Sequence, residues 1–339
     1  MKIIDLRSDT VTLPTQEMRQ AMCNAVVGDD VYNEDITVQQ LEALAAKITD
    51  KEAALFVPSG TMGNQLAIMT HTKRGDEIIA GDSSHIIEHE VGAAAVLAGV
   101  TVRTAKTQNG ILSSSEVLKL IRSENIHHPD TGLICIENAT AMGTVMSLDE
   151  MKEIYETAKK ANIPVHLDGA RLFNAAVVLG VEAAQITAYT DSVMFCLSKG
   201  LCAPIGSILA GSREFIEKAR RNRKLLGGGM RQVGILAAAG MFALEKMVER
   251  LDEDHKNAKL LAEALSSIPG VDVDTSTVQI NMVFADISRT GKTETEFVEA
   301  MLEKGIKINE SKPLRFVTNH DVSRQDIEFT IETIKGIFE

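Results

Sequence analysis

The sequence predicts an α/β protein with a mainly parallel sheet covered by helices, and two observations support this prediction. From about residue 50 onward, short apolar segments of high β propensity alternate with longer segments of helical period. The short segments end at glycine, proline or polar turn residues, which is typical of buried parallel strands. Seven strands are therefore expected, at Ala53–Val57, Glu77–Ala80, Val100–Arg103, Leu133–Glu137, Val165–Asp168, Val193–Cys196 and Ser207–Ala210.

Two helices are clearly marked in the same region. Ser147 and Glu150 have the spacing of a capping box, which predicts a helix that runs to about Ala161. The Ala-rich segment from Gln232 to about Arg250 predicts one long helix that leaves the sheet.

The end of that long helix marks a domain boundary. We expect a large domain at residues 1–250, with the N-terminal segment included, and a small C-terminal α+β domain at residues 251–339. The small domain is expected to contain helices near 257–267 and 293–303, strands near 279–286 and 314–318, and a closing helix.

The composition excludes several classes of partner. A net charge of -12 and a pI near 5.2 argue against binding to nucleic acid or to an anionic membrane surface. The N-terminus lacks an apolar run of signal-peptide length, and no later run is long enough to span a membrane. The four cysteines show no metal-binding spacing, so we interpret them as reduced core thiols, and we expect a cytoplasmic protein without a metal site.

Lys199 is the only charge in the apolar stretch from Val193 to Gly206, and it follows a predicted strand. The carboxyl ends of parallel strands are where α/β proteins build their sites. Burial would favour the neutral amine, the form that attacks an aldehyde to make a Schiff base. A loop lysine that extends to solvent is the alternative.

A small phosphate cradle is expected at Ser59-Gly60-Thr61, between the first strand and a helix. Its backbone amides and hydroxyl groups would face the same sheet edge. A plain turn without a ligand is the alternative, since neither the P-loop nor the dinucleotide fingerprint is present.

Asp168 ends another strand and leads into Gly169-Ala170-Arg171, which places a carboxylate and a guanidinium at the same edge. Asp168 could keep a pyridinium nitrogen protonated, or it could form only a loop-tying pair with Arg171. A phosphate cradle, a ring-nitrogen carboxylate and an aldehyde-binding lysine, in this order, together specify pyridoxal 5′-phosphate as cofactor.

The chain resembles the low-specificity L-threonine aldolases, which belong to the aspartate-aminotransferase-like, fold type I class of pyridoxal-phosphate enzymes. The resemblance covers essentially the whole length. It implies a Schiff base at Lys199, phosphate contacts at Gly60 and Thr61, and a ring-nitrogen contact at Asp168. The matching segments are Asp5–Thr12, Gly28–Tyr32, Phe56–Asn64, His166–Asn174, Cys196–Leu201 and Gly227–Gln232.

The resemblance also implies the residues that bind the substrate. Arg171, Arg315 and Ser8 would hold its carboxylate, so that the bond to be broken stands perpendicular to the cofactor ring. His85 would stack on that ring and contact the substrate, and His127, with His128 as the alternative, would lie near the substrate hydroxyl.

Tyr32, Lys224 and Arg231 lie far from these residues in the sequence. The resemblance implies that they reach the site of a neighbouring subunit in a homotetramer, where Lys224 and Arg231 add positive charge near the cofactor phosphate. Without the resemblance, a solvated basic helix would be the better interpretation of the segment around Lys224.

The sequence thus predicts an enzyme that cleaves L-threonine, L-allo-threonine and related β-hydroxy-α-amino acids to glycine and an aldehyde. A β-eliminating lyase or transaminase with the same fold is the chemical alternative, and a cofactor-binding protein without turnover or a nicotinamide-binding protein are others. Two departures from the family pattern bear on substrate preference: Glu137–Ala141 lacks a histidine, and Glu88-His89 stands where an aromatic residue is frequent.

Overall fold

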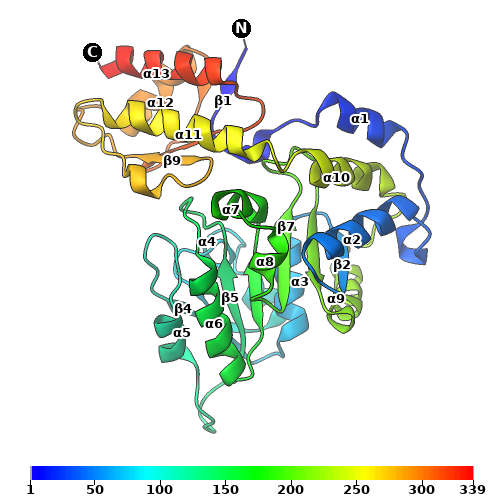
Figure 1. Cartoon of the computed structure of the whole chain (residues 1–339). Helices are drawn as coiled ribbons and strands as arrows, with labels where there is room; N and C mark the ends of the chain where they lie inside the picture. The colour runs from blue at the N-terminus through cyan, green and yellow to red at the C-terminus, as the bar shows by residue number, and fades with distance from the viewer. Residues whose placement is uncertain (1, 339) are drawn as a thin grey trace.

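The computed structural model describes residues 2–338, and in this range it contains a seven-stranded sheet that confirms the predicted α/β class (Figure 1). The strand order is β2-β8-β7-β6-β5-β3-β4. Only β8 runs antiparallel to its neighbours β2 and β7, so the sheet is mainly parallel. The strands are β2 (Ala53–Val57), β3 (Glu77–Gly81), β4 (Thr101–Ala105), β5 (Thr131–Glu137), β6 (Val165–Asp168), β7 (Ser192–Cys196) and β8 (Ser207–Gly211).

Helices cover both faces of this sheet, because successive side chains of each strand point to opposite faces. On β7, Met194 packs in a cluster with residues of α3 (Gly60–His71) and α9 (Arg213–Leu225). Its neighbours Val193 and Phe195 pack in a second cluster on the other face. That cluster includes residues of α2 (Ile36–Ile48), α6 (Leu148–Lys160), α7 (Leu172–Leu179) and α10 (Gly234–Lys246).

The N-terminal segment packs with the C-terminal part of the chain. Strand β1 (Ile4–Asp5) pairs in parallel with β10 (Ile306–Lys307), and Ile4 and Leu6 lie in a hydrophobic cluster whose other members come from residues 258–334. In this region β9 (Met282–Ala285) pairs with β11 (Leu314–Val317), beside α11 (Leu251–Ser266), α12 (Glu294–Glu303) and α13 (Arg324–Phe338). The boundary at residue 250 stays a prediction.

The long helix predicted at Gln232–Arg250 is shorter in the structure. Helix α10 ends at Lys246, and α11 already begins at Leu251 rather than near residue 257. The first turn of α11 is rich in acidic residues, which favour the positive end of a helix dipole, and Arg250 pairs with Asp254 one turn later. These charges favour the start of a second helix at Leu251, whereas the apolar period alone predicted that α10 continues.

The remaining helices are short. They are α1 (Gln16–Cys23), α4 (His85–Glu88), α5 (Ser114–Leu120) and α8 (Ala183–Thr187).

The cysteines differ in their burial. Cys23 lies exposed at the end of α1, so the prediction of a core thiol is wrong there, whereas Cys135, Cys196 and Cys202 are buried. No helix between residues 2 and 338 has both the length and the apolar character needed to cross a membrane.

Candidate active site

Several predicted site residues meet at the carboxyl edge of the parallel strands. Asp168 is the last residue of β6, and Glu137, the last residue of β5, is its register partner. The backbone N–H of His85 donates to Glu137 Oε2 at 3.0 Å. Burial and the negative charge of Asp168 raise the pKa of Glu137, while the nearby His85 and Lys199 charges act in the opposite direction.

Lys199 follows β7 at the same edge, and its backbone is fixed from the N-terminal segment. Thr12 Oγ1 donates to the carbonyl oxygen of Lys199 at 2.9 Å. The side chain is half-buried, and its amine has no hydrogen-bond or ion-pair partner among residues 2–338. An amine in this position is available to an aldehyde.

The amino end of α3 lies at this edge because glycine lets the helix approach β7. A Cβ on Gly60 would lie 3.0 Å from Cys196 Sγ, and one on Gly63 would lie 2.5 Å from Met194 Cγ. Ser59 caps the helix, since its side chain accepts from the backbone N–H of Met62 at 3.2 Å. The unpaired amides of the first helical turn, near Gly60 and Thr61, form a site for an anionic group such as a phosphate.

Asp168 is 2% exposed, and its carboxylate accepts two hydrogen bonds. Its Oδ1 accepts from the backbone N–H of Ala170 at 3.0 Å, and its Oδ2 accepts from Asn64 Nδ2 at 2.7 Å. A buried carboxylate, a free amine and a helix amino end are complementary to the ring nitrogen, the aldehyde and the phosphate of pyridoxal 5′-phosphate. The residues present therefore fit this cofactor.

His85 is the first residue of α4, and its side chain contacts the buried carboxylate of Glu90. Its Nδ1 lies 3.0 Å from Glu90 Oε1, and Glu90 is 1% exposed. This hydrogen bond raises the pKa of His85, against the opposing effect of burial. The ring centroid of His89 lies 5.3 Å from that of His85, so the histidine that replaces an aromatic residue is a direct neighbour of the predicted ring-stacking histidine.

The structure also brings the three predicted carboxylate-binding residues together. Arg171 forms a two-bond ion pair with the buried Asp9, at 2.8 Å and 2.6 Å, and Ser8 is the neighbour of Asp9 in the chain. Burial opposes ionisation of Asp9, but Arg171 holds the pKa of this carboxyl below its usual value. Arg315 Nη2 donates to the carbonyl oxygen of Arg7, the residue before Ser8, at 3.3 Å, and burial together with the like charge of Arg171 lowers the pKa of Arg315.

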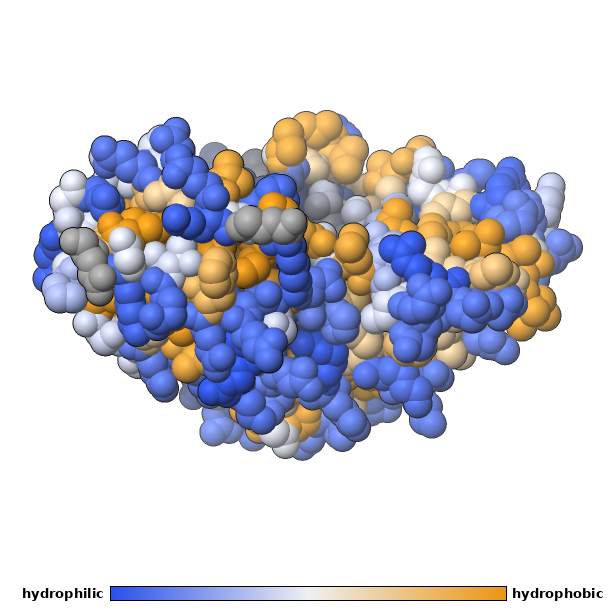
Figure 2. Space-filling view, turned by 90° about the horizontal axis from the view of Figure 1, so that it is seen from above, coloured by the Kyte–Doolittle hydropathy of each residue, from blue (hydrophilic) through white to orange (hydrophobic). Residues whose placement is uncertain are grey.

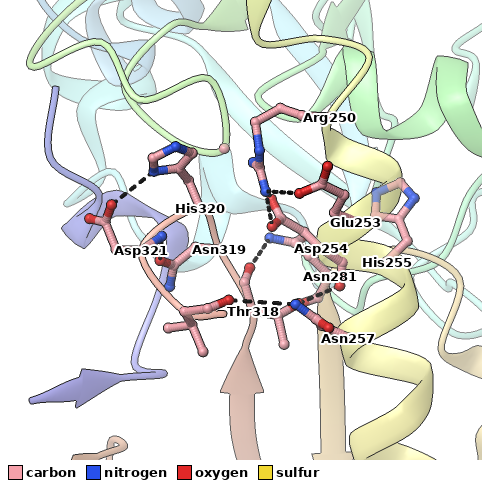
Figure 3. Close-up of polar contacts among 12 residues, drawn as sticks. Arg250, Glu253, Asp254, His255, Asn257, Asn281, Thr318, Asn319, His320 and Asp321 are labelled. Carbon is pink, nitrogen blue, oxygen red and sulfur yellow. Dashed lines mark hydrogen bonds and ion pairs between the residues drawn. The ribbon is translucent and has the colours of Figure 1, made fainter. Parts of the chain in front are cut away.

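Asp9 is a site residue that sequence reasoning missed, although it stands in one of the matching segments. Asn281 connects it to the small C-terminal region, because Asn281 Nδ2 donates to Asp9 Oδ2 at 3.2 Å and to the carbonyl oxygen of Thr318 at 2.9 Å. Figure 3 shows Asn281 and Thr318 beside Asp254, which pairs with Arg250 at the start of α11. The contacts around Arg171 thus extend to the junction between α10 and α11.

Four predicted residues do not meet at this edge within one chain. Tyr32 is 73% exposed, and Arg231 is exposed and pairs with Asp29 at 2.9 Å. Lys224 is exposed beside a cavity of about 400 Å³ at the end of α9. His127 is exposed in the loop that precedes β5, and therefore lies at the amino end of a strand whose carboxyl end carries Glu137. The roles of these four residues stay predictions.

Comparisons with known proteins agree on one family. The model of the beta-eliminating lyases matches residues 5–288. Low-specificity L-threonine aldolase 1 of Arabidopsis thaliana is 44% identical over 98% of this chain and 95% of its own. Low specificity L-threonine aldolase of Escherichia coli K12 is 44% identical over 96% of each chain. The solved threonine aldolase of Leishmania major, 20% identical over 99% of this chain and 100% of its own, has the same fold with a TM-score of 0.86.

Proposed function

We propose that this chain, which belongs to the beta-eliminating lyase family and to its low-specificity L-threonine aldolases, cleaves L-threonine, L-allo-threonine and related β-hydroxy-α-amino acids to glycine and an aldehyde. Such an enzyme is a carbon–carbon lyase that depends on pyridoxal 5′-phosphate. The fold is the fold type I class that the sequence predicted. The observation that carries the proposal is the meeting of Asp168, Lys199 and the amino end of α3 at one sheet edge, next to the Asp9–Arg171 pair.

The cofactor would be held by residues of this edge. Lys199 would bind its aldehyde carbon, the amides of Gly60 and Thr61 with the hydroxyl of Ser59 its phosphate, Asp168 its ring nitrogen and His85 the face of its ring. When bound, the cofactor supplies an electron-accepting ring for the pair released by the broken carbon–carbon bond.

The substrate carboxylate would be held by Arg171, Arg315 and Ser8. Asp9 already neutralises much of the charge of Arg171 and fixes the orientation of its guanidinium through two bonds. Arg315, which has no such acid in the described chain and donates to the carbonyl oxygen of Arg7 at 3.3 Å, would supply most of the net positive charge. Arg171 would therefore orient the substrate carboxylate, and Arg315 would attract it.

Cleavage also requires removal of the proton from the substrate β-hydroxyl. Because His85 Nδ1 is engaged with Glu90, Nε2 is the ring atom of His85 that can accept this proton, directly or through a water molecule. His127 of a second copy of the chain is the other candidate for this role.

A product assay separates this reaction from the main alternative, a β-eliminating lyase or transaminase, which the family description keeps open. The purified protein is incubated with L-threonine and with L-allo-threonine, and both pairs of products are measured. We expect acetaldehyde and glycine in equal amounts, whereas a keto acid, with free ammonia for β-elimination or without it for transamination, would overturn the proposal. Lys199→Ala is expected to abolish the reaction, and Lys218→Ala, which removes an exposed lysine of α9, is the matched control.

We also propose a homotetramer in a cytoplasmic location. Tyr32, Lys224 and Arg231 would then complete the site of a neighbouring copy. In support, Figure 2 shows hydrophobic residues, interspersed with hydrophilic ones, on the right of the view, the side where Figure 1 places α1 and α10. Exposed apolar side chains of this region include Leu13, Val26 and Ile235, and exposed apolar side chains that lie together are typical of an interface. Light scattering of the purified protein tests the assembly, and a monomer would contradict it.

A further inference from the structure

A chain of buried polar side chains lies directly beneath Asp168, between α3 and the sheet. Asn64, His166 and Ser192 are each 0% exposed. Asn64 and His71 are seven residues apart on α3, which places them on one face two turns apart. His166 and Asp168 share one face of β6, and Ser192 on β7 is the register partner of His166. The helix face and the sheet face therefore meet through polar groups.

Each member of this chain contacts the next at hydrogen-bond distance. Asn64 Nδ2 lies 2.7 Å from Asp168 Oδ2, and Asn64 Oδ1 lies 3.1 Å from His166 Nε2. His166 Nδ1 lies 2.9 Å from Ser192 Oγ, which lies 2.8 Å from His71 Nε2. The chain thus runs from the end of α3 to the proposed ring-nitrogen carboxylate.

The direction of every bond in the chain follows from its carboxylate end. Asn64 Nδ2 contacts both Asp168 and Glu90, the latter at 2.8 Å, so both of its hydrogens are donated to carboxylates. Asn64 Oδ1 must then accept from His166 Nε2–H. In a neutral imidazole the other nitrogen is an acceptor, so Nδ1 of that ring accepts from the next hydroxyl in the chain.

The far end of the chain is fixed in the same way. Ser192 Oγ–H donates to His166 Nδ1, and Ser192 Oγ accepts from His71 Nε2–H. This order requires a neutral His166, whose Nδ1 accepts, and a His71 that carries a hydrogen on Nε2. Burial lowers the pKa of His166 to about 3 and that of His71 to about 4, so both are neutral near pH 7. All the donated hydrogens therefore point toward Asp168.

Asn64 is also a junction to the histidine above the cofactor ring. Its amide joins Asp168 to Glu90, and Glu90 accepts from Gln65 Nε2 at 2.6 Å while it holds His85 Nδ1. One amide group thus ties together the two side chains proposed to contact opposite features of the cofactor ring. A rotation of this amide would turn its oxygen toward two carboxylates, which is electrostatically unfavourable.

We propose that Asn64, His166, Ser192 and His71 are positioning residues that hold the carboxylate of Asp168 correctly oriented for the ring nitrogen of the cofactor. The inference depends on the proposed role of Asp168. In this arrangement His166 sets the orientation of Asn64, because its Nε2–H donates to the amide oxygen and so keeps that oxygen away from Asp168.

The test compares two cofactors in each variant. Dissociation constants are measured by equilibrium dialysis for pyridoxal 5′-phosphate and for its 1-deaza analogue, in which a carbon replaces the ring nitrogen. For His166→Leu we expect binding of the natural cofactor to weaken about tenfold, because Asn64 loses the contact that orients it and with it the hydrogen bond that it donates to the charged Asp168, and binding of the analogue to change less than twofold. His166→Gln, which retains a donor, should restore part of this difference.

A matched control comes from another buried histidine. His255 is 4% exposed and pairs with Asn174 at 3.0 Å, so His255→Leu removes a similar Asn–His hydrogen bond outside the chain beneath Asp168. It should leave the ratio of the two dissociation constants unchanged. If His166→Leu does not fold, as judged by circular dichroism, Ser192→Ala decides the question, with a smaller shift of the ratio in the same direction.

The outcomes separate the two levels of the argument. Equal weakening of both cofactors in His166→Leu or Ser192→Ala would overturn the inference, because a merely structural role does not depend on a ring nitrogen. Asp168→Asn serves as the reference, and it should discriminate most strongly between the cofactors. If Asp168→Asn does not discriminate, the proposed role of Asp168 fails; if it does and the other variants do not, only the positioning role fails.

Discussion

Two groups of predicted site residues differ in how this chain holds them. Asp168, Arg171 and His85 are each fixed by a buried partner: Asn64, Asp9 and Glu90 respectively. Tyr32, Lys224, Arg231 and His127 are exposed, and of these Arg231 has only a surface ion pair. The first group is preorganised by the fold of one chain. The second group could act only after a second copy has placed it, so the two groups should respond differently to mixing, substitution and pH.

The largest expected effect is recovery of activity when two inactive variants are mixed. Lys199→Ala and Arg231→Ala should each have little activity, but co-expressed chains form mixed dimers in which one site carries neither change. Random pairing makes half of the dimers mixed, so roughly a quarter of the sites should be intact. Activity of the whole co-expressed protein, without separation of the mixed dimers and relative to the unsubstituted enzyme, measures this recovery.

Mixing Lys199→Ala with Arg171→Ala provides the control for that experiment. Both residues are held within one chain, so every site carries at least one substitution when they are combined. No recovery is expected in this control. A lack of recovery with Arg231→Ala as well would contradict the proposal that sites are shared.

A smaller but still large effect is expected on stability from the first group. Asp9→Asn leaves the buried guanidinium of Arg171 without its counter-charge, which should lower the free energy of unfolding by about 3–5 kcal/mol. It should also raise KM more than it lowers kcat, because orientation of the substrate carboxylate is lost. Urea unfolding and steady-state kinetics measure the two effects.

Asp5→Asn is the matched control, since Asp5 pairs with Arg7 in the same segment but at the surface. Removal of this partly exposed pair should cost less than about 1 kcal/mol. Similar losses in the two variants would show that burial of Asp9 has no special importance.

The buried histidines predict a dependence of stability on pH. His71 and His166 have pKa values of about 4 and 3 in the folded chain, below the ordinary value of 6.5. Between these values the unfolded chain binds more protons, so stability falls as pH decreases below about 6.5. Each histidine contributes up to about 1.4 kcal/mol per pH unit. Urea unfolding at pH 7.5 and pH 5.5 should show a weaker dependence for His71→Gln and an unchanged one for His128→Gln, which alters an exposed residue.

The sheet was predictable from sequence because buried parallel strands have a strong local signal. Ala53–Val57 and Val165–Asp168 agree at both ends with β2 and β6, and the other five strands differ by one or two residues. The break between α10 and α11 was missed, because charges at Arg250 and Asp254 act against an apolar period that continues through them. The pairing of β1 with β10 joins residues about 300 positions apart, which no local pattern reveals.

The site was predictable only in part, and for a similar reason. Asp168 and Lys199 each follow an apolar strand, so their unusual chemistry is visible locally. Asn64 and Asp9 are identified as positioning groups only by their partners Asp168 and Arg171, which lie 104 and 162 residues away. A signal was nevertheless present: His166 and Ser192 are polar residues in mainly apolar strands, and a polar residue buried in a sheet needs a partner.

The smallest expected effect on stability belongs to Lys224, a residue of the exposed group. Lys224 is exposed in the single chain, so Lys224→Met should change the free energy of unfolding by less than about 0.5 kcal/mol. If a second copy brings this lysine to the cofactor phosphate, the same variant should nevertheless bind pyridoxal 5′-phosphate about tenfold more weakly, since a charged contact to an anion is lost. Equilibrium dialysis measures this change, with Lys218→Met on the same helix as control. If the variant keeps both its stability and its cofactor affinity, Lys224 is an ordinary surface residue and does not belong to the cofactor site of a second copy.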